Sequence, residues 1–372
     1  MLPAPSPRGP HLTDVVRNLM ASLRGERGEL DLPTASSAIV VLVDGLGAEP
    51  LRAAAGHART LAGAMSRRDV IESGFPTTTA AALASLTTGL PPGQHGLVGY
   101  SVLDPEHDRV VNQLSGWDDG MRPERWQDRP TLFETAAASG LRPVVVGPAR
   151  YADSGFTRAV LRGAEYRGAR TVPERFAIAA DAAREPGSLI YVYVPELDQA
   201  GHKHGVESDR WIRALEDLDA VIRDIVLPPG AGMLLTADHG MLDIPDSGKL
   251  LVDQAPGLLD DVRHLAGEPR CLQLHLEAGA DADAVAQRWR ESEGDRAWVV
   301  TRAEAIVAGW FGPVRPEVAP RIGDVLVAAR KRVAYYDGRH ASEQGIGMVG
   351  QHGSWSPEEL RVPLLRFGAY AR

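Results

Sequence analysis

Four apolar runs, each ended by Asp, Pro or Gly, are spaced along the chain. They read SSAIVVLVDGLG, LRPVVVGP, SLIYVYVPELD and GMLLTADHG. Short runs rich in β-branched residues indicate buried strands, and helical patterns lie between them. Strands that alternate with helices predict an α/β fold with a mostly parallel central sheet and helices on both faces. In such sheets ligands bind beyond the carboxyl ends of the strands.

The same pattern divides the chain into segments of different character. Residues 1–36 are predicted to be an N-terminal tail and a surface helix, and residues 37–249 the central core. In residues 250–330 short strands surround helices without acidic and histidine residues at their ends, so we interpret this segment as an inserted α+β subdomain or cap. Residues 331–372 return to the core as its C-terminal part.

Composition and charge exclude several classes of function. A formal net charge of −9 argues against nucleic-acid binding, which needs a basic face. No apolar run approaches the length of a membrane span, and the proline-rich N-terminus lacks the layout of a signal peptide. The single cysteine, Cys271, excludes an internal disulfide and a cysteine-based metal cluster. We therefore expect a cytoplasmic protein, and the sequence does not indicate its oligomeric state.

Acidic and histidine residues follow the predicted strands and form a mixed oxygen and nitrogen ligand set. They are Asp44, Asp198, His202, Asp238, His239 and His352. Such a set suits Zn²⁺ or a similar borderline metal ion. Six ligands are too many for one tetrahedral ion and enough for two sites of three ligands, each with an open position. Each motif alone has a structural explanation as a turn or loop residue, but the ordered set predicts a two-metal centre for phosphoryl transfer.

These motifs together resemble the alkaline phosphatase superfamily, and most closely its nucleotide pyrophosphatase/phosphodiesterase branch. The resemblance rests on VLVDGLG, TGLPPGQHG, ELDQAGHKHG, TADHG and GQHGS, and it covers roughly residues 37–245 and 335–367. It implies an alkaline-phosphatase-like core and two divalent metal ions, Zn²⁺ with Mn²⁺ or Fe²⁺ as alternatives. The family pattern implies that Asp198, His202 and His352 hold one ion. It implies that Asp44, Asp238 and His239 hold the other, and that the nucleophile reaches both ions.

The stretch GFPTTTAAALASLTTG places three threonines in front of a predicted helix. The family separates its nucleophile by ten residues from the Gly of the following Thr-Gly pair, and counting back from Gly89 gives Thr79. The first helical turn offers unpaired backbone N–H groups to an incoming phosphate. We expect Thr78 to point about 100° away around a helical turn, and Thr77 to shape the turn. The resemblance thus implies hydrolysis of a small phosphate ester or anhydride through phospho-Thr79, with Thr79 also a metal ligand.

The substrate-binding positions depart from the family pattern. Ala80, Ala81 and Ala82 stand where the diesterases often carry Phe-Pro-Asn, and Tyr100 stands where a phosphate-binding asparagine is expected. Tyr100 either donates its hydroxyl to a phosphate oxygen or packs under its loop. Residues 73–100 contain no Lys or Arg. This favours diesters or nucleotide pyrophosphate-type bonds over monoesters, whose extra charge favours a nearby cation, unless an arginine of residues 250–330 reaches the site.

Other functions of the same superfamily stay open. A phosphomonoesterase, a phosphonate hydrolase and a phosphomutase share the metal set. A sulfatase is disfavoured, because its nucleophile needs a Cys or Ser context that is absent around Cys271. A non-catalytic metal-binding protein would be expected to lose a ligand or the nucleophile, and none is lost here.

Overall fold

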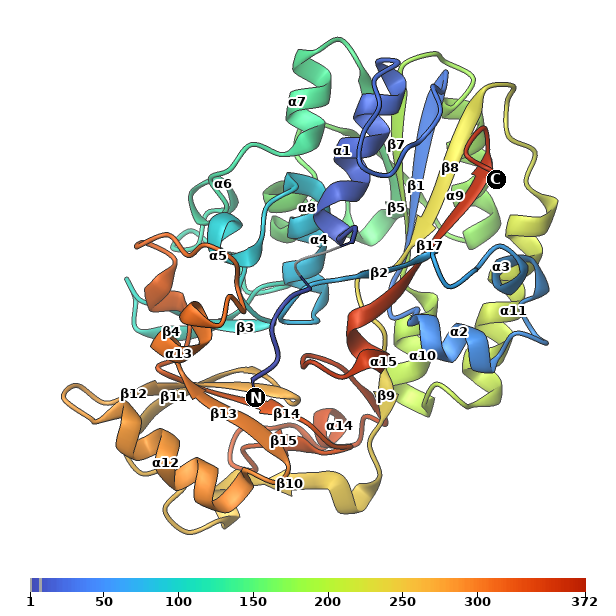
Figure 1. Ribbon diagram of the computed structural model, residues 1–372. Helices are drawn as coiled ribbons and strands as arrows, with labels where there is room; N and C mark the ends of the chain where they lie inside the picture. The colour runs from blue at the N-terminus through green and yellow to red at the C-terminus, as the bar shows by residue number, and fades with distance from the viewer. Residues whose placement is uncertain (1, 7–8) are drawn as a thin grey trace.

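The computed structural model describes residues 2–6 and 9–372 (Figure 1). Residues 1, 7 and 8, which belong to the predicted N-terminal tail, lie outside the described residues. In the described part the larger sheet has seven strands. Their order is β2 (Val70–Glu72), β17 (Arg361–Gly368), β8 (Ala231–Thr236), β1 (Ser37–Val43), β7 (Ser188–Val194), β5 (Arg142–Pro148) and β6 (Glu165–Ala169). From β8 to β6 all neighbours are parallel, and β17 is antiparallel to β8, so the predicted α/β fold is confirmed.

Helices cover both faces of this sheet, which explains why its central strands are apolar along their whole length. Every residue of β1 is buried. On one side lie α1 (Leu12–Leu23), α4 (Thr79–Thr88), α7 (Leu132–Ala138) and α8 (Gly155–Val160). On the other lie α2 (Ala48–Ala53), α3 (Arg59–Gly63), α9 (Val172–Ala182), α10 (Glu196–His204) and α11 (Asp209–Asp224) (Figure 1). Such two-sided cover is the usual environment of a parallel sheet.

A second sheet forms the lower part of the molecule in Figure 1. Its order is β13 (Ala297–Thr301), β14 (Val325–Ala329), β12 (Cys271–Leu276), β11 (Val262–Glu268), β3 (Ser101–Asp104) and β4 (Arg109–Asn112). The helices α12 (Ala282–Glu293) and α13 (Arg302–Val307) pack against its strands. The β3–β4 hairpin lies outside the segment 250–330 that the sequence predicted as a subdomain. It joins the sheet because Ser101 pairs with Gly267 of β11.

Shorter elements connect the two sheets. They are α5 (Pro92–His95), α6 (Pro123–Trp126), α14 (Glu343–Ile346), α15 (Pro357–Leu360), and the strand pairs β10 (Lys249–Leu251) with β15 (Ala334–Tyr336) and β9 (Leu242–Asp243) with β16 (Gly350–Gln351). Aromatic rings also pack across the junction. The ring of Phe75, just before α4, stacks on Trp355 at a centroid distance of 4.6 Å. The ring of Trp310 contacts Phe75 edge-on at a centroid distance of 4.8 Å. The second sheet and its helices are called the second unit from here on. This unit therefore packs against the turn that leads into α4.

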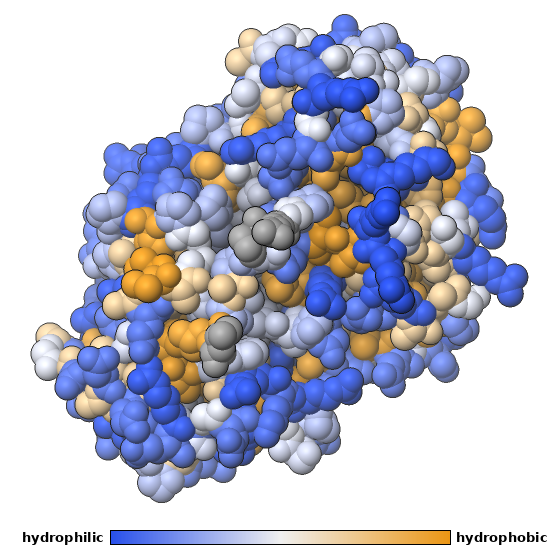
Figure 2. All heavy atoms as spheres, viewed as in Figure 1, coloured by the Kyte–Doolittle hydropathy of each residue, from blue (hydrophilic) through white to orange (hydrophobic). Residues whose placement is uncertain are grey.

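Hydrophilic residues cover most of the face shown in Figure 2, with hydrophobic residues in patches between them. Within residues 2–6 and 9–372, none of the helices combines the length and the apolar character that a membrane span requires.

Candidate metal centre

The register of the parallel strands brings the predicted ligands to one edge of the larger sheet. Val43, the last residue of β1, pairs with Val194 of β7, and Leu42 pairs with Thr236 of β8. Asp44 directly follows β1, Asp238 lies two residues beyond β8, and Asp198 lies in the first turn of α10 beyond β7. Parallel strands end at the same edge, so these carboxylates converge.

Asp198, His202 and His352 form one group of ligand atoms. The Nε2 atom of His202 lies 3.3 Å from Oδ1 of Asp198 and 3.3 Å from Nε2 of His352. Oδ1 of Asp198 lies 3.9 Å from Nε2 of His352. Asp198 and His202 are four residues apart on α10 and therefore share one helix face.

Asp44, Asp238 and His239 form a second group beside the first. Nε2 of His239 lies 3.5 Å from Oδ1 of Asp44 and 3.6 Å from Oδ2 of Asp238. The His239 ring stacks on the His352 ring at a centroid distance of 3.6 Å. The ligand atoms of His239, His352 and Asp198 also lie within 4.8 Å of one another, so the two groups form one continuous cluster.

The hydrogen bonds of this cluster fit metal ligation. Among the described residues, no hydrogen-bond partner is found for the buried oxygens Asp44 Oδ1, Asp198 Oδ1 and Asp238 Oδ2. Burial, followed by the charges of Asp238 and Asp198, raises the pKa of Asp44 well above its usual value. Carboxylates without partners are costly to bury, and a divalent cation would satisfy them.

The imidazoles are oriented in the way that metal-binding histidines usually are. Nδ1 of His202 donates to the carbonyl of Gly350 at 2.8 Å, and Nδ1 of His352 donates to that of Thr77 at 2.8 Å. Nδ1 of His239 donates to the carbonyl of Gly240 at 3.0 Å. Since a carbonyl only accepts, each Nδ1 carries the proton, and each Nε2 keeps the lone pair with which it could bind a metal ion.

Thr79 is the first residue of α4 and lies inside the cluster. Its Oγ1 is 3.1 Å from Nε2 of His239. Thr78 is the N-cap residue with an extended backbone, φ −135° and ψ 143°, so the helical rotation of 100° expected between the two side chains does not apply to it. The Thr77 hydroxyl donates to the carbonyl of Ser354 at 2.8 Å. Thr77 therefore ties the turn before α4 to the loop that carries His352.

The sequence model of the type I phosphodiesterase / nucleotide pyrophosphatase family matches residues 38–355. The chain belongs to this family. The predicted resemblance to the nucleotide pyrophosphatase/phosphodiesterase branch is thus confirmed, and the chain is a hydrolase of this type.

Several solved structures share the fold of this chain. Murine ectonucleotide pyrophosphatase / phosphodiesterase 5 is 16% identical, with a TM-score of 0.68 over 89% of this chain and 88% of that chain. An inactive variant of the murine protein in complex with AMP is 17% identical, with a TM-score of 0.69 over 90% and 88%. Phosphonoacetate hydrolase from Sinorhizobium meliloti in complex with phosphonoacetate is 20% identical, with a TM-score of 0.65 over 90% and 91%.

Tyr100, predicted as a substrate-binding residue of this phosphodiesterase-family chain, has an exposed side chain. Within the described residues its hydroxyl has no hydrogen-bond partner, while its backbone N–H donates to Oε2 of Glu268 at 2.8 Å. Glu268 was not singled out in the sequence, because an acid at the end of β11 carries no motif. Its side chain is buried against Gly353, and burial raises its pKa to about 8.

An aromatic cavity of about 120 Å³ adjoins Thr79. Its lining includes Phe156, Tyr151, Tyr166, Tyr191 and Tyr193. Tyr191 and Tyr193 alternate along β7 and their rings stack at 6.4 Å. The Tyr193 hydroxyl donates to Oδ2 of Asp44, which links the cavity to the ligand cluster. In the sequence, the alternate tyrosines of the run IYVYV were the one available sign that Tyr191 and Tyr193 lie on the same face of a strand and line this cavity.

Proposed function

We propose that this chain hydrolyses phosphate diesters or nucleotide pyrophosphate-type bonds with Thr79 as the nucleophile and two divalent metal ions as cofactors. One observation carries the proposal. The Thr79 hydroxyl lies at the start of α4, 3.1 Å from Nε2 of His239, beside buried carboxylate oxygens that have no hydrogen-bond partner among the described residues.

The ligand groups assign the residues that would hold the ions. Asp198, His202 and His352 would bind one ion. Asp44, Asp238 and His239, with Thr79, would bind the other. Zn²⁺ suits this mixed carboxylate and imidazole set, and Mn²⁺ and Fe²⁺ are the alternatives. When bound, such ions act as Lewis acids that favour an ionised hydroxyl and neutralise charge on the phosphoryl oxygens.

Thr79 would carry the phosphoryl group between two displacements. Its hydroxyl releases its proton to solvent as Oγ1 attacks phosphorus and forms an Oγ1–P bond. The bond to the leaving oxygen breaks, and the leaving oxygen takes up a proton from solvent. Water then attacks the same phosphorus and the Oγ1–P bond breaks. One proton of the water passes to Oγ1 of Thr79, which restores the hydroxyl. The N–H groups in the first turn of α4 have no partner within the helix and would donate to the phosphoryl oxygens, which would stabilise their negative charge.

Charge and shape favour a diester or anhydride over a monoester. A monoester carries an extra negative charge that a nearby Arg or Lys would offset. Arg270 of the second unit approaches the His352 loop, but its guanidinium is paired with Glu359 at 2.7 Å. The aromatic cavity beside Thr79 offers room for an uncharged or aromatic ester group.

A substrate comparison tests the proposal. The zinc-loaded protein should hydrolyse bis(p-nitrophenyl) phosphate with a higher kcat/KM than p-nitrophenyl phosphate or phosphonoacetate. A strong preference for the monoester would reject the proposed preference for diesters or anhydrides over monoesters. A preference for phosphonoacetate would favour the phosphonate hydrolase alternative. Full activity after exhaustive chelation would reject the metal centre itself.

A further inference from the structure

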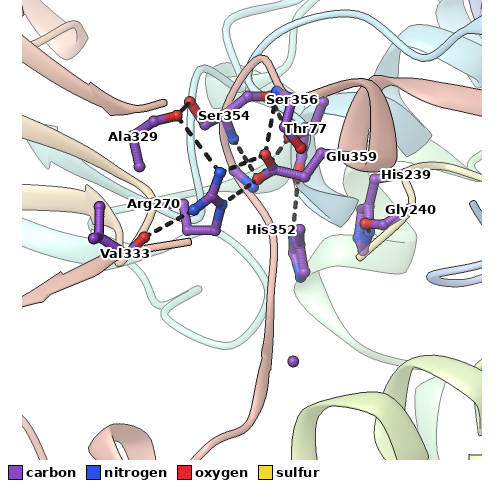
Figure 3. Close-up of polar contacts among 12 residues, drawn as sticks. Thr77, His239, Gly240, Arg270, Ala329, Val333, His352, Ser354, Ser356 and Glu359 are labelled. Carbon is purple, nitrogen blue, oxygen red and sulfur yellow. Dashed lines mark hydrogen bonds and ion pairs between the residues drawn. The ribbon is translucent and has the colours of Figure 1, made fainter. Parts of the chain in front are cut away.

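The turn between β11 and β12 brings a buried arginine of the second unit to the loop that follows His352 (Figure 3). Arg270 Nε lies 2.7 Å from Oε1 of Glu359, and Nη2 lies 2.8 Å from Oε2. Both side chains are 0% exposed. Nη1 of Arg270 also donates to the carbonyls of Lys331 and Val333, at 2.8 Å each. The ion pair is therefore fully buried, and two hydrogen bonds join its side chains.

A pair of this kind calls for an explanation other than stability. Removing two charges from water costs about as much as their attraction returns, and apolar replacements are often as stable. Buried, two-point arginine–carboxylate contacts do fix geometry, because both planar groups must align.

Hydrogen bonds lead from Glu359 to the metal ligand His352. Oε1 of Glu359 accepts from the backbone N–H of Ser354 at 2.9 Å. The Ser354 carbonyl accepts from the Thr77 hydroxyl at 2.8 Å, and that hydroxyl accepts from the N–H of Gly353 at 3.0 Å. The Thr77 carbonyl then accepts from Nδ1 of His352 at 2.8 Å. Figure 3 shows this series of contacts running from the arginine to the imidazole.

Backbone contacts join the same glutamate to the other ligand group. The Glu359 carbonyl accepts from the N–H of Gly240 at 2.8 Å, and Gly240 directly follows His239. A Cβ added at Gly240 would overlap the carbonyl oxygen of Glu358. This contact does not involve the Glu359 side chain, so a side-chain substitution would leave it in place.

We propose that Arg270 and Glu359 are positioning residues of the metal centre. Their ion pair fixes the loop of residues 352–356 and the Thr77 turn, and so holds the His352 imidazole toward Asp198 and His202. The second unit is then a structural part of the metal site and not only a cap over it. This inference rests on the proposed function, since it takes the His352 group to be a metal site.

The double variant Arg270→Met/Glu359→Leu tests the proposal without leaving one buried charge unpaired. The metal-free protein is titrated with Zn²⁺ in competition with a chromophoric chelator, and thermal unfolding is followed in parallel. We expect one Zn²⁺ to bind as in the wild type and the other to bind about 10- to 100-fold more weakly, the usual effect of removing support from a ligating histidine. A purely structural pair would lower the unfolding temperature without separating the two affinities.

The control is Arg302→Met/Asp324→Leu, which removes a partly exposed ion pair. This pair also lies in the second unit, with Nη2 of Arg302 2.7 Å from Oδ1 of Asp324, and its other bonds go to Ile322 and Leu276. Both Zn²⁺ affinities should stay at wild-type values in the control.

Two wild-type Zn²⁺ affinities in the folded double variant would overturn the inference. If the double variant does not fold, Arg270→Lys replaces it, because lysine keeps the charge and loses the two-point contact. The same selective weakening, of smaller size, is then expected, and unchanged affinities would overturn the inference. A wild-type protein that binds no Zn²⁺ would instead reject the proposed function, so the two failures are distinguishable.

Discussion

The buried carboxyl of Glu268 should make the folded protein sensitive to pH in a way that glutamine abolishes. Its side chain is 5% exposed, its Oε2 accepts from Tyr100, and no partner for its Oε1 is found in the described part of the chain. Burial raises the pKa of Glu268 from 4.5 to about 8. Glutamine has nearly the shape of the protonated acid and keeps a carbonyl for the Tyr100 N–H.

The size and the sign of the effect follow from the pKa difference between the folded and unfolded chains. Below pH 4.5 both states hold the proton, and Glu268 contributes its full stability. Between pH 4.5 and about 8 the unfolded chain loses the proton while the folded chain keeps it, so the free energy of unfolding falls by about 1.4 kcal/mol per pH unit. Over the whole interval the loss is roughly 5 kcal/mol as an upper bound.

Urea unfolding of the wild type and of Glu268→Gln between pH 4.5 and pH 9, both in excess chelator, measures this difference. The variant should match the wild type at the acidic end and become progressively more stable than it as the pH rises, with a plateau above about pH 8. The difference between the two proteins cancels other titrating groups. A difference that stays constant with pH, or that falls as pH rises, would refute the account of Glu268.

Three further outcomes are expected. Thr79→Ala should keep the fold and the bound metal and lose roughly 10³-fold or more in kcat, while Thr78→Ala loses far less. An inactive Thr78→Ala variant together with an active Thr79→Ala variant would assign the nucleophile to Thr78 instead. Removal of the metal by a chelator should abolish turnover, and added Zn²⁺ should restore it. Tyr193→Phe removes the hydrogen bond to Asp44, and should weaken Zn²⁺ binding by roughly 10-fold, which competition titration would detect.

The sheet and the convergence of the ligands were predictable from local patterns. Asp44 and Asp238 end or follow apolar runs, and parallel strands deliver their carboxyl ends to one edge whatever the rest of the fold does. The spacing of Asp198 and His202 places them on one face of a helix for the same local reason. Motif order then linked these positions to a family.

Contacts between distant segments were not predictable in this way. Ser101 pairs with Gly267 through backbone groups that any residue provides, so the sequence carried no sign that β3 and β4 belong to the second sheet. Arg270 and Glu359 stand in no motif, and their partnership depends on how the β11–β12 turn meets the loop after His352. The predicted rotation of about 100° between Thr78 and Thr79 assumed that both residues are helical. The helix begins only at Thr79, and Thr78 is its N-cap residue.

The place of the β3–β4 hairpin limits how this protein can be divided or recombined. The hairpin follows α4 and α5 in the chain, whereas its neighbour β11 comes more than a hundred residues later. Deletion of residues 250–330 would leave β3 with an unpaired backbone edge, and such edges pair readily with other chains and promote aggregation. A transplant of this unit between relatives would therefore have to carry two separate stretches together. The same constraint applies to any gene fusion or domain exchange that alters the second sheet.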